Sequence, residues 1–180
     1  DRGYVGAAAY PKFVGGLSFS GDWKGIDLSF LFQAGLGRDV ALTGVYSGGI
    51  MDNTQMTKPF YHGGNSPKYL VENSWREDNT NAEFPRLSIV QASSNNAYSS
   101  TFWYRSGDYL RLKNLQIGYT FPQKWMSRIG IDRLRIYFEG QNLWTVSELT
   151  KFNIDPEQPG VSNGYYPQQR IFSFGVNLAF

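Results

Sequence analysis

The carboxylates of Asp155 and Glu157 are the side chains whose spacing comes nearest to a chemical site in this sequence. Two neighbouring carboxylates can bind a hard cation or act as the acid and base of glycoside hydrolysis. Here they flank Pro156 in a predicted loop, and no further oxygen ligands follow at the spacing of a calcium-binding loop. The sequence therefore favours a structural turn at this place and predicts no metal site.

Cysteine and histidine chemistry has almost no residues to draw on. The chain contains no Cys and a single His, His62. A thiolate metal centre and a cysteine nucleophile are therefore excluded, and a histidine-rich metal centre has only one ligand available. We expect a protein that is not an enzyme and that carries no cofactor.

Aromatic side chains in and beside the longest predicted connections are the other candidates for function. Aromatic rings hold sugars and peptides, and they also anchor protein interfaces. The alternative is that these rings pack the connections against each other or against a partner, and for any single residue the sequence favours that alternative. The candidates for contact with a cargo or with a partner lid are Tyr61, Trp75, Trp103, Tyr165 and Tyr166.

The elements that position these residues are predicted to be β-strands. Of the 180 residues, 17% are aromatic and 20 are Gly, while only 18% are charged, against roughly 25% in a typical globular chain. The net charge is +2 with both signs scattered, so no basic patch suggests a nucleic-acid partner. Composition therefore predicts an all-β protein that does not bind nucleic acid.

Alternation of apolar and polar residues, typical of strands, occurs in five segments. Several alternate for about ten residues, which exceeds the roughly five or six of an average globular strand and suits a tilted transmembrane strand. The second face is polar or small, as a watery lumen requires, although a soluble β-sandwich with a polar outer face is the alternative. The segments lie near 13–23, 26–37, 106–121, 133–147 and 170–180.

Short and long connections alternate between these strands. The turns after the first and third strands are short, whereas 38–105 and 148–169 are long, as periplasmic turns and extracellular loops are in outer-membrane barrels. Five strands are an odd number and leave two open edges, which lipid cannot satisfy. The sequence thus predicts part of a larger barrel, and a sixth strand has only one short candidate, Phe84–Ala92.

Three further expectations follow from the strand pattern. The phase of the third strand flips between Leu112 and Asn114, which predicts a β-bulge near Lys113 or Asn114. Arg135 and Glu139 share the polar face of the fourth strand. We expect them to face the lumen, because charge at the lipid midplane costs roughly 2–4 kcal/mol.

Several motifs resemble those of the SusC/RagA-type TonB-dependent transporters, in the same order and at similar spacing. Gly107–Pro122 (GDYLRLKNLQIGYTFP) resembles the "YLRLKNLTLGYTLP" signature of that family, and Ile129–Thr145 resembles its "IG…LRLYVSGQNLFT" segment. Asp155-Pro156-Glu157 stands where the family has a DPE loop. The hairpin within Pro11–Phe32 and the final strand Arg170–Phe180 also have counterparts.

The resemblance implies the C-terminal strands of a 22-stranded barrel in the bacterial outer membrane. The remaining partners it implies are the N-terminal strands and plug of the same transporter, a SusD-like surface lipoprotein, outer-membrane lipid, and the TonB complex through an N-terminal part absent from this sequence. The implied cargo is oligosaccharide or peptide. In this family a terminal aromatic residue, here Phe180, is implied to be the signal for barrel assembly. The alternative function is a soluble or surface carbohydrate-binding β-sandwich.

Overall fold

The computed structural model describes residues 3, 8–42, 67–87, 100–159 and 168–180. The chain divides into two compact units, each described by itself below. One unit consists of residues 12–36, 109–147 and 167–180, and we call it the sheet unit. The other consists of residues 1–11, 37–108 and 148–166, and we call it the loop unit.

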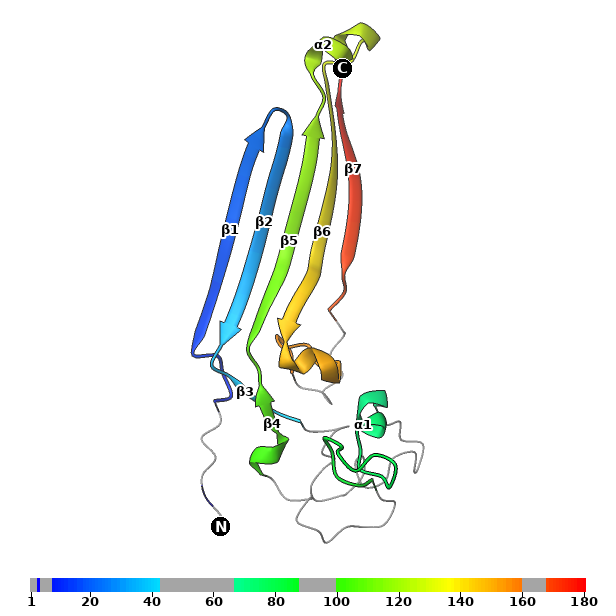
Figure 1. Ribbon diagram of the computed structural model, residues 1–180. Coiled ribbons are helices and arrows are strands. Elements are labelled where there is room, and N and C mark those ends of the chain that lie inside the picture. The colour runs from blue at the N-terminus through cyan, green and yellow to red at the C-terminus, as the bar shows by residue number, and fades with distance from the viewer. Residues whose placement is uncertain (1–2, 4–7, 43–66, 88–99, 160–167) are drawn as a thin grey trace. The chain divides into compact units, whose positions relative to one another are not determined.

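The sheet unit is one antiparallel sheet of five strands in the order β1-β2-β5-β6-β7 (Figure 1). This confirms the all-β prediction. Neighbouring strands of the sheet are paired along most of their length. The strands are β1 (Phe13–Trp23), β2 (Ile26–Leu36), β5 (Tyr109–Thr120), β6 (Arg133–Ser147) and β7 (Ile171–Ala179).

Tight connections join the strands at one end of the sheet (Figure 1). β1 and β2 meet in a two-residue turn, where Lys24 and Gly25 both have positive φ, 49° and 88°. Two positive values are typical of a type I′ hairpin turn, and Gly accepts such a φ without strain. Between β5 and β6 lies a short helical stretch, α2 (Gln123–Met126) followed by a 3-10 turn at Ser127–Ile129.

The register of the strands separates an apolar face from a polar face. One row across the sheet pairs Leu28, Ile117, Phe138 and Phe174, and the next pairs Ser29, Gln116, Glu139 and Ser173. The predicted bulge is confirmed, because β5 shifts register between Leu112 and Asn114 and leaves Lys113 outside the ladder to β6. The bulge restores the apolar residues of β5 to one face along its whole length.

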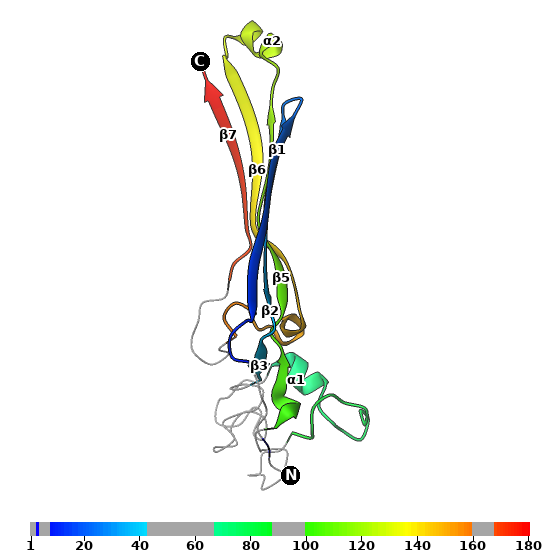
Figure 2. The ribbon, with the colours of Figure 1, turned by 90° about the vertical axis from the view of Figure 1, so that its left-hand side faces the viewer.

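The sheet is a single layer, as its edge-on view shows (Figure 2). Large apolar side chains on its apolar face are exposed, including Phe174 at 83% and Leu17 at 66%. The cluster of buried hydrophobic residues found among the described residues does not include any residue of the sheet unit. The strands therefore present an apolar face that water does not favour.

The loop unit contains the hydrophobic core of the described part of the chain. Here β3 (Asp39–Ala41) pairs with β4 (Tyr104–Ser106), and a short helix, α1 (Lys68–Glu72), and a 3-10 turn (Glu148–Phe152) pack nearby. The core is formed by Val40, Leu42, Leu70, Phe84, Trp103, Leu149, Phe152 and Ile154. The long connections are therefore folded where they are described.

Two details of the predicted strands change. Residue 106 was expected in the third strand, but Tyr104–Ser106 forms β4 in the small sheet and β5 begins only at Tyr109. Of the candidate sixth strand, Phe84 forms a single parallel bridge with Ser74, and residues 88–92 lie outside the described residues. Neither segment has the sustained period-two pattern that makes a long strand recognisable.

Candidate functional site

Glu83 is the centre of a charged network in the loop unit. Its carboxylate accepts hydrogen bonds from the Tyr69 hydroxyl at 2.7 Å, from Arg105 Nη2 at 3.1 Å and from Lys151 Nζ at 3.1 Å. The three donors come from α1, β4 and the 3-10 turn at Glu148–Phe152. Glu148 accepts contacts from the same two cations, at 3.7 Å from Arg105 and 4.0 Å from Lys151. The network therefore ties together segments from both long connections.

This network shifts the pKa values of its acidic members in opposite directions. The hydrogen bond to Glu83, together with partial burial and the nearby negative charge, raises the pKa of Tyr69 to about 12. Partial burial opposes ionisation of Glu83, but hydrogen bonds from Tyr69, Lys151 and Arg105 outweigh it and hold the pKa of Glu83 below its usual value. The charged form of Glu83 and the neutral form of Tyr69 are thus both favoured by the fold.

The cations of the network also lie over aromatic rings of the core. Arg105 stands 5.6 Å from the Phe152 ring centre, and Lys151 stands 4.7 Å from it. Phe84 stacks on Trp103 at 6.2 Å between ring centres. Trp103 is only 4% exposed and packs in the core of the loop unit; its contact with cargo or a lid stays a prediction.

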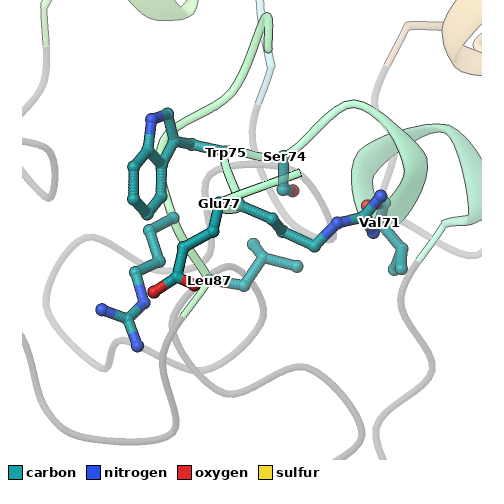
Figure 3. Close-up of a pocket in the computed structure, with 7 residues that line it drawn as sticks. Val71, Ser74, Trp75, Glu77 and Leu87 are labelled. Atoms are coloured by element: carbon teal, nitrogen blue, oxygen red, sulfur yellow. The ribbon is translucent and has the colours of Figure 1, made fainter. Parts of the chain in front are cut away.

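A hollow of about 380 Å³ opens beside Trp75 in the loop unit (Figure 3). A second hollow, of about 540 Å³, shares Trp75 and Arg86 with the first. Both volumes fall in the range of small-ligand pockets. The residues that line the first are Val71, Ser74, Trp75, Arg76, Glu77, Arg86 and Leu87. An aromatic face with charged groups of both signs can hold a peptide or a sugar.

Trp75 is the predicted loop aromatic that the structure places at such a hollow. Its side chain is 37% exposed, and its indole forms one wall in Figure 3. Its contact with cargo stays a prediction. Tyr61, Tyr165 and Tyr166 lie outside the described residues. The sequence offered no sign of Arg86 or Glu77 as neighbours of Trp75, because local spacing does not show which loop residues surround a hollow.

Asp155 and Glu157 form a turn. The backbone N–H of Glu157 donates to Asp155 Oδ1 at 2.8 Å, and the N–H of Gln158 donates to the Asp155 carbonyl at 3.1 Å. A side-chain oxygen that accepts from the backbone two residues later is typical of an Asx turn. Within the described ranges, no group of three or more His, Cys, Asp or Glu residues is arranged to hold a metal ion.

The polar face of the sheet unit holds the two predicted lumen-facing residues. Arg135 donates from Nε and Nη2 to the carboxylate of Asp27, at 2.9 and 2.5 Å. Glu139 accepts a hydrogen bond from Gln141 at 3.2 Å. The register places Asp27, Arg135 and Glu139 on one face, and the lumen as the surroundings of that face stays a prediction. Nothing in the sequence indicated Asp27 as the partner of Arg135, because two strands separated by a third are not expected to form a salt bridge.

Phe180 follows the end of β7 and is 84% exposed. Its role in barrel assembly stays a prediction. None of the described helices is long and apolar enough to cross a membrane.

No protein-family model matches the chain. Among curated proteins, the chain is 28% identical to TonB-dependent receptor P3 of Formosa agariphila, over 100% of this chain and 17% of that protein. It is also 30% identical to TonB-dependent receptor SusC of Bacteroides thetaiotaomicron, over 57% of this chain and 10% of that protein. The chain thus spans less than a fifth of the length of these relatives.

Solved structures of similar fold include the RagAB peptide importer in its open-open state. That match has a TM-score of 0.66 and 26% identity, and covers 98% of this chain and 18% of that chain. A structure of the RagAB peptide transporter matches with a TM-score of 0.64 and 25% identity, over 98% of this chain and 18% of that chain. Sequence and structure comparisons therefore lead to the same group of proteins.

Proposed function

Because the chain belongs to the C-terminal portion of the SusC/RagA-type TonB-dependent receptors, we propose that it forms one wall of an outer-membrane β-barrel that imports nutrients. The five strands supply part of the wall, and the rest of the receptor supplies the strands that close it. The part played by this chain in uptake is positioning and binding, without covalent chemistry. The relatives are named receptors, and the matched structures are named importers and transporters.

The observation that carries this proposal is the exposed apolar face of the sheet. Ile117, Phe138 and Phe174 lie in one row on that face, and Phe174 is 83% exposed. A soluble sandwich would cover such a face with a second sheet, and no second layer lies on it in the described part of the sheet unit. Lipid covers it without cost, because hydrocarbon tails are as apolar as the side chains.

The topology that follows puts the loop unit outside the cell. In outer-membrane barrels the short turns face the periplasm and the long connections face the exterior. The β1–β2 turn, α2 and Phe180 then lie on the periplasmic side. The loop segments 37–108 and 148–166 then face the medium, where a cargo and a SusD-like lipoprotein lid would meet them. A plug and the TonB complex would act through the rest of the receptor, and 22 strands is the expected total.

The cargo class we propose is an oligosaccharide or a peptide. Trp75 with Arg76, Glu77 and Arg86 offers an aromatic face beside charges of both signs, which suits either class. The name of the RagAB importer favours a peptide for that protein, and the name SusC implies no cargo by itself.

Site-directed labelling tests the topology. This chain contains no Cys, so Glu77→Cys and Lys24→Cys each introduce a single thiol into this part of the receptor. We expect a membrane-impermeant maleimide to label Glu77→Cys in intact cells, and to label Lys24→Cys only after the outer membrane is permeabilised. Labelling of Lys24→Cys in intact cells would contradict the proposed orientation.

A solubility measurement separates the receptor from the carbohydrate-binding sandwich. We expect the isolated chain to require detergent, because its apolar face has no partner in water. A monodisperse particle of 20.4 kDa, the mass of one chain, in detergent-free buffer would contradict the transporter and support the sandwich.

A further inference from the structure

Three residues from three different strands meet on the polar face of the sheet. Asp27 lies on β2, Gly118 on β5 and Arg135 on β6. β5 lies between the other two strands, yet the guanidinium of Arg135 reaches across it and donates two hydrogen bonds to Asp27. A bidentate pair of this kind is stronger and more directional than a single hydrogen bond.

Gly118 makes this crossing possible. It pairs directly with Asp27 in the β2–β5 ladder and therefore lies beneath the point where the two charged groups meet. A Cβ on Gly118 would lie 2.5 Å from Arg135 Nη2 and 2.7 Å from Asp27 Oδ1. Real Cβ atoms essentially never lie under 3.0 Å from another atom, so a side chain at position 118 would require the ends of Asp27 and Arg135 to shift from this arrangement.

Side chains on β6 extend the arrangement to a fourth strand. Arg135 lies over the Tyr137 ring, 4.8 Å from its centre. The Tyr137 ring in turn occupies the space above Gly175 of β7, the residue with which Tyr137 pairs. Two long side chains of β6 are thus laid flat on the sheet, one toward β5 and β2 and the other toward β7.

We propose that Asp27, Gly118 and Arg135 form a latch that fixes the register of β2, β5 and β6. In this latch the guanidinium of Arg135 has a structural role within the sheet. The salt bridge between Arg135 and Asp27 forms only when Gly118 pairs with Asp27 in the β2–β5 ladder. A slip of one residue would bring a side chain into the gap and turn one partner to the other face. Arg135 is then not a contact for cargo or for an inner domain. The latch is inferred from contacts within the sheet, and it rests on the proposed function only because the experiment below measures folded barrel in outer membranes.

The test uses the full receptor that contains this chain, expressed in outer membranes. Gly118→Ala removes the gap, and Gly16→Ala on β1 is its control, since a Cβ there meets only Phe32 O at 3.4 Å and Leu31 Cδ1 at 3.7 Å. Arg135→Gln and Asp27→Asn remove the charges, and Glu139→Gln on the same face is their control. The readouts are the fraction of heat-modifiable folded barrel and uptake per folded barrel.

We expect Arg135→Gln to raise the unfolded-to-folded ratio by about tenfold or more, the size expected for hydrogen bonds between charged groups. Gly118→Ala should raise it by a smaller factor, because the ends of Asp27 and Arg135 can shift around the added Cβ. Arg135→Gln should do more harm than Asp27→Asn. Asp22 pairs with Asp27 across β1 and β2, and without Arg135 the two carboxylates repel. Uptake per folded barrel should stay unchanged, and exchanging the charges in Asp27→Arg/Arg135→Asp should recover part of the loss.

Two results would overturn the latch. One is a folded fraction in Gly118→Ala equal to that in Gly16→Ala. The other is a normal folded fraction in Arg135→Gln with reduced uptake, which would make Arg135 a contact for cargo or for an inner domain. A wild-type receptor that never reaches the outer membrane would instead contradict the proposed function, so the two failures are distinguishable.

Discussion

At the scale of single residues, Glu83 has more partners than any sequence pattern around it indicates. It accepts from Tyr69, Arg105 and Lys151, and its side chain is 27% exposed. We expect Glu83→Gln to destabilise the loop unit by about 1–3 kcal/mol, because charged hydrogen bonds are lost and their donors remain partly buried. Hydrogen exchange in α1 measures this, and Glu77→Gln, at an exposed position of the same unit, should leave the exchange unchanged.

The same residue predicts how the loop unit responds to acid. Because the pKa of Glu83 is lowered in the folded state, its contribution to stability is fully present above the ordinary carboxyl pKa. That contribution is lost as the pH falls through the lowered value. We expect protease cleavage within residues 67–87 to increase over that acidic window. A Glu83→Gln receptor should show no such step, and an equal step in both proteins would assign it to another group.

The two described loop tryptophans should behave differently on truncation. Trp103→Ala removes a ring from the core and should cost about 3–5 kcal/mol, as large-to-small core substitutions do. Trp75→Ala removes a ring from the wall of an open hollow and should change stability by no more than about 0.5 kcal/mol. Hydrogen exchange of the loop unit, measured at increasing temperature, compares the stability of the two variants. Equal losses would mean that Trp75 also supports the core.

At the scale of elements, the two faces of the sheet predict opposite responses to charge. Ile117 and Gln116 are neighbours on β5 whose side chains point to opposite faces. Ile117→Arg should cost about 2–4 kcal/mol if it lies at the membrane midplane, whereas Gln116→Arg should be tolerated. Folded barrel in outer membranes, measured by heat modifiability, distinguishes the two. Equal loss in both variants would contradict the assignment of the faces.

Period-two alternation is what made the sheet predictable. Side chains of β2, β5 and β6 alternate over ten or more residues, so strands, faces and the bulge at Lys113 follow from the order of residues alone. The latch does not follow, although Asp27 and Arg135 were both on polar faces. Its geometry depends on a missing side chain at Gly118, and the sequence does not show which strands are neighbours.

The loop unit was predictable in its residue types but not in its structure. Leu42, Phe84 and Phe152 come from segments far apart in the chain, and no local period relates them. The sequence favoured packing for any single loop aromatic, but it did not indicate which rings meet in one core. The core forms because these segments meet in three dimensions, and Trp103 is buried for the same reason. Contacts between residues so far apart in the chain cannot be predicted from the spacing of residues along the sequence.

At the scale of the whole molecule, the two units differ in how they place their apolar side chains relative to water. The loop unit buries its apolar residues in a core of its own, as a water-exposed fold must. The sheet unit leaves apolar residues such as Phe172 and Val176 exposed. The hydrophobic effect therefore favours the native state of the loop unit directly, whereas it favours removal of the sheet unit from water.

Under the proposed function, the loop core also limits how the receptor can acquire a new cargo during evolution. Side chains within the core, such as Phe84 and Leu149, cannot vary freely without loosening the scaffold. Side chains at the rim, such as Arg76, Glu77 and Arg86, can be exchanged at little structural cost. A library that randomises the rim and retains the Glu83 network would search new specificities while keeping most of its members folded.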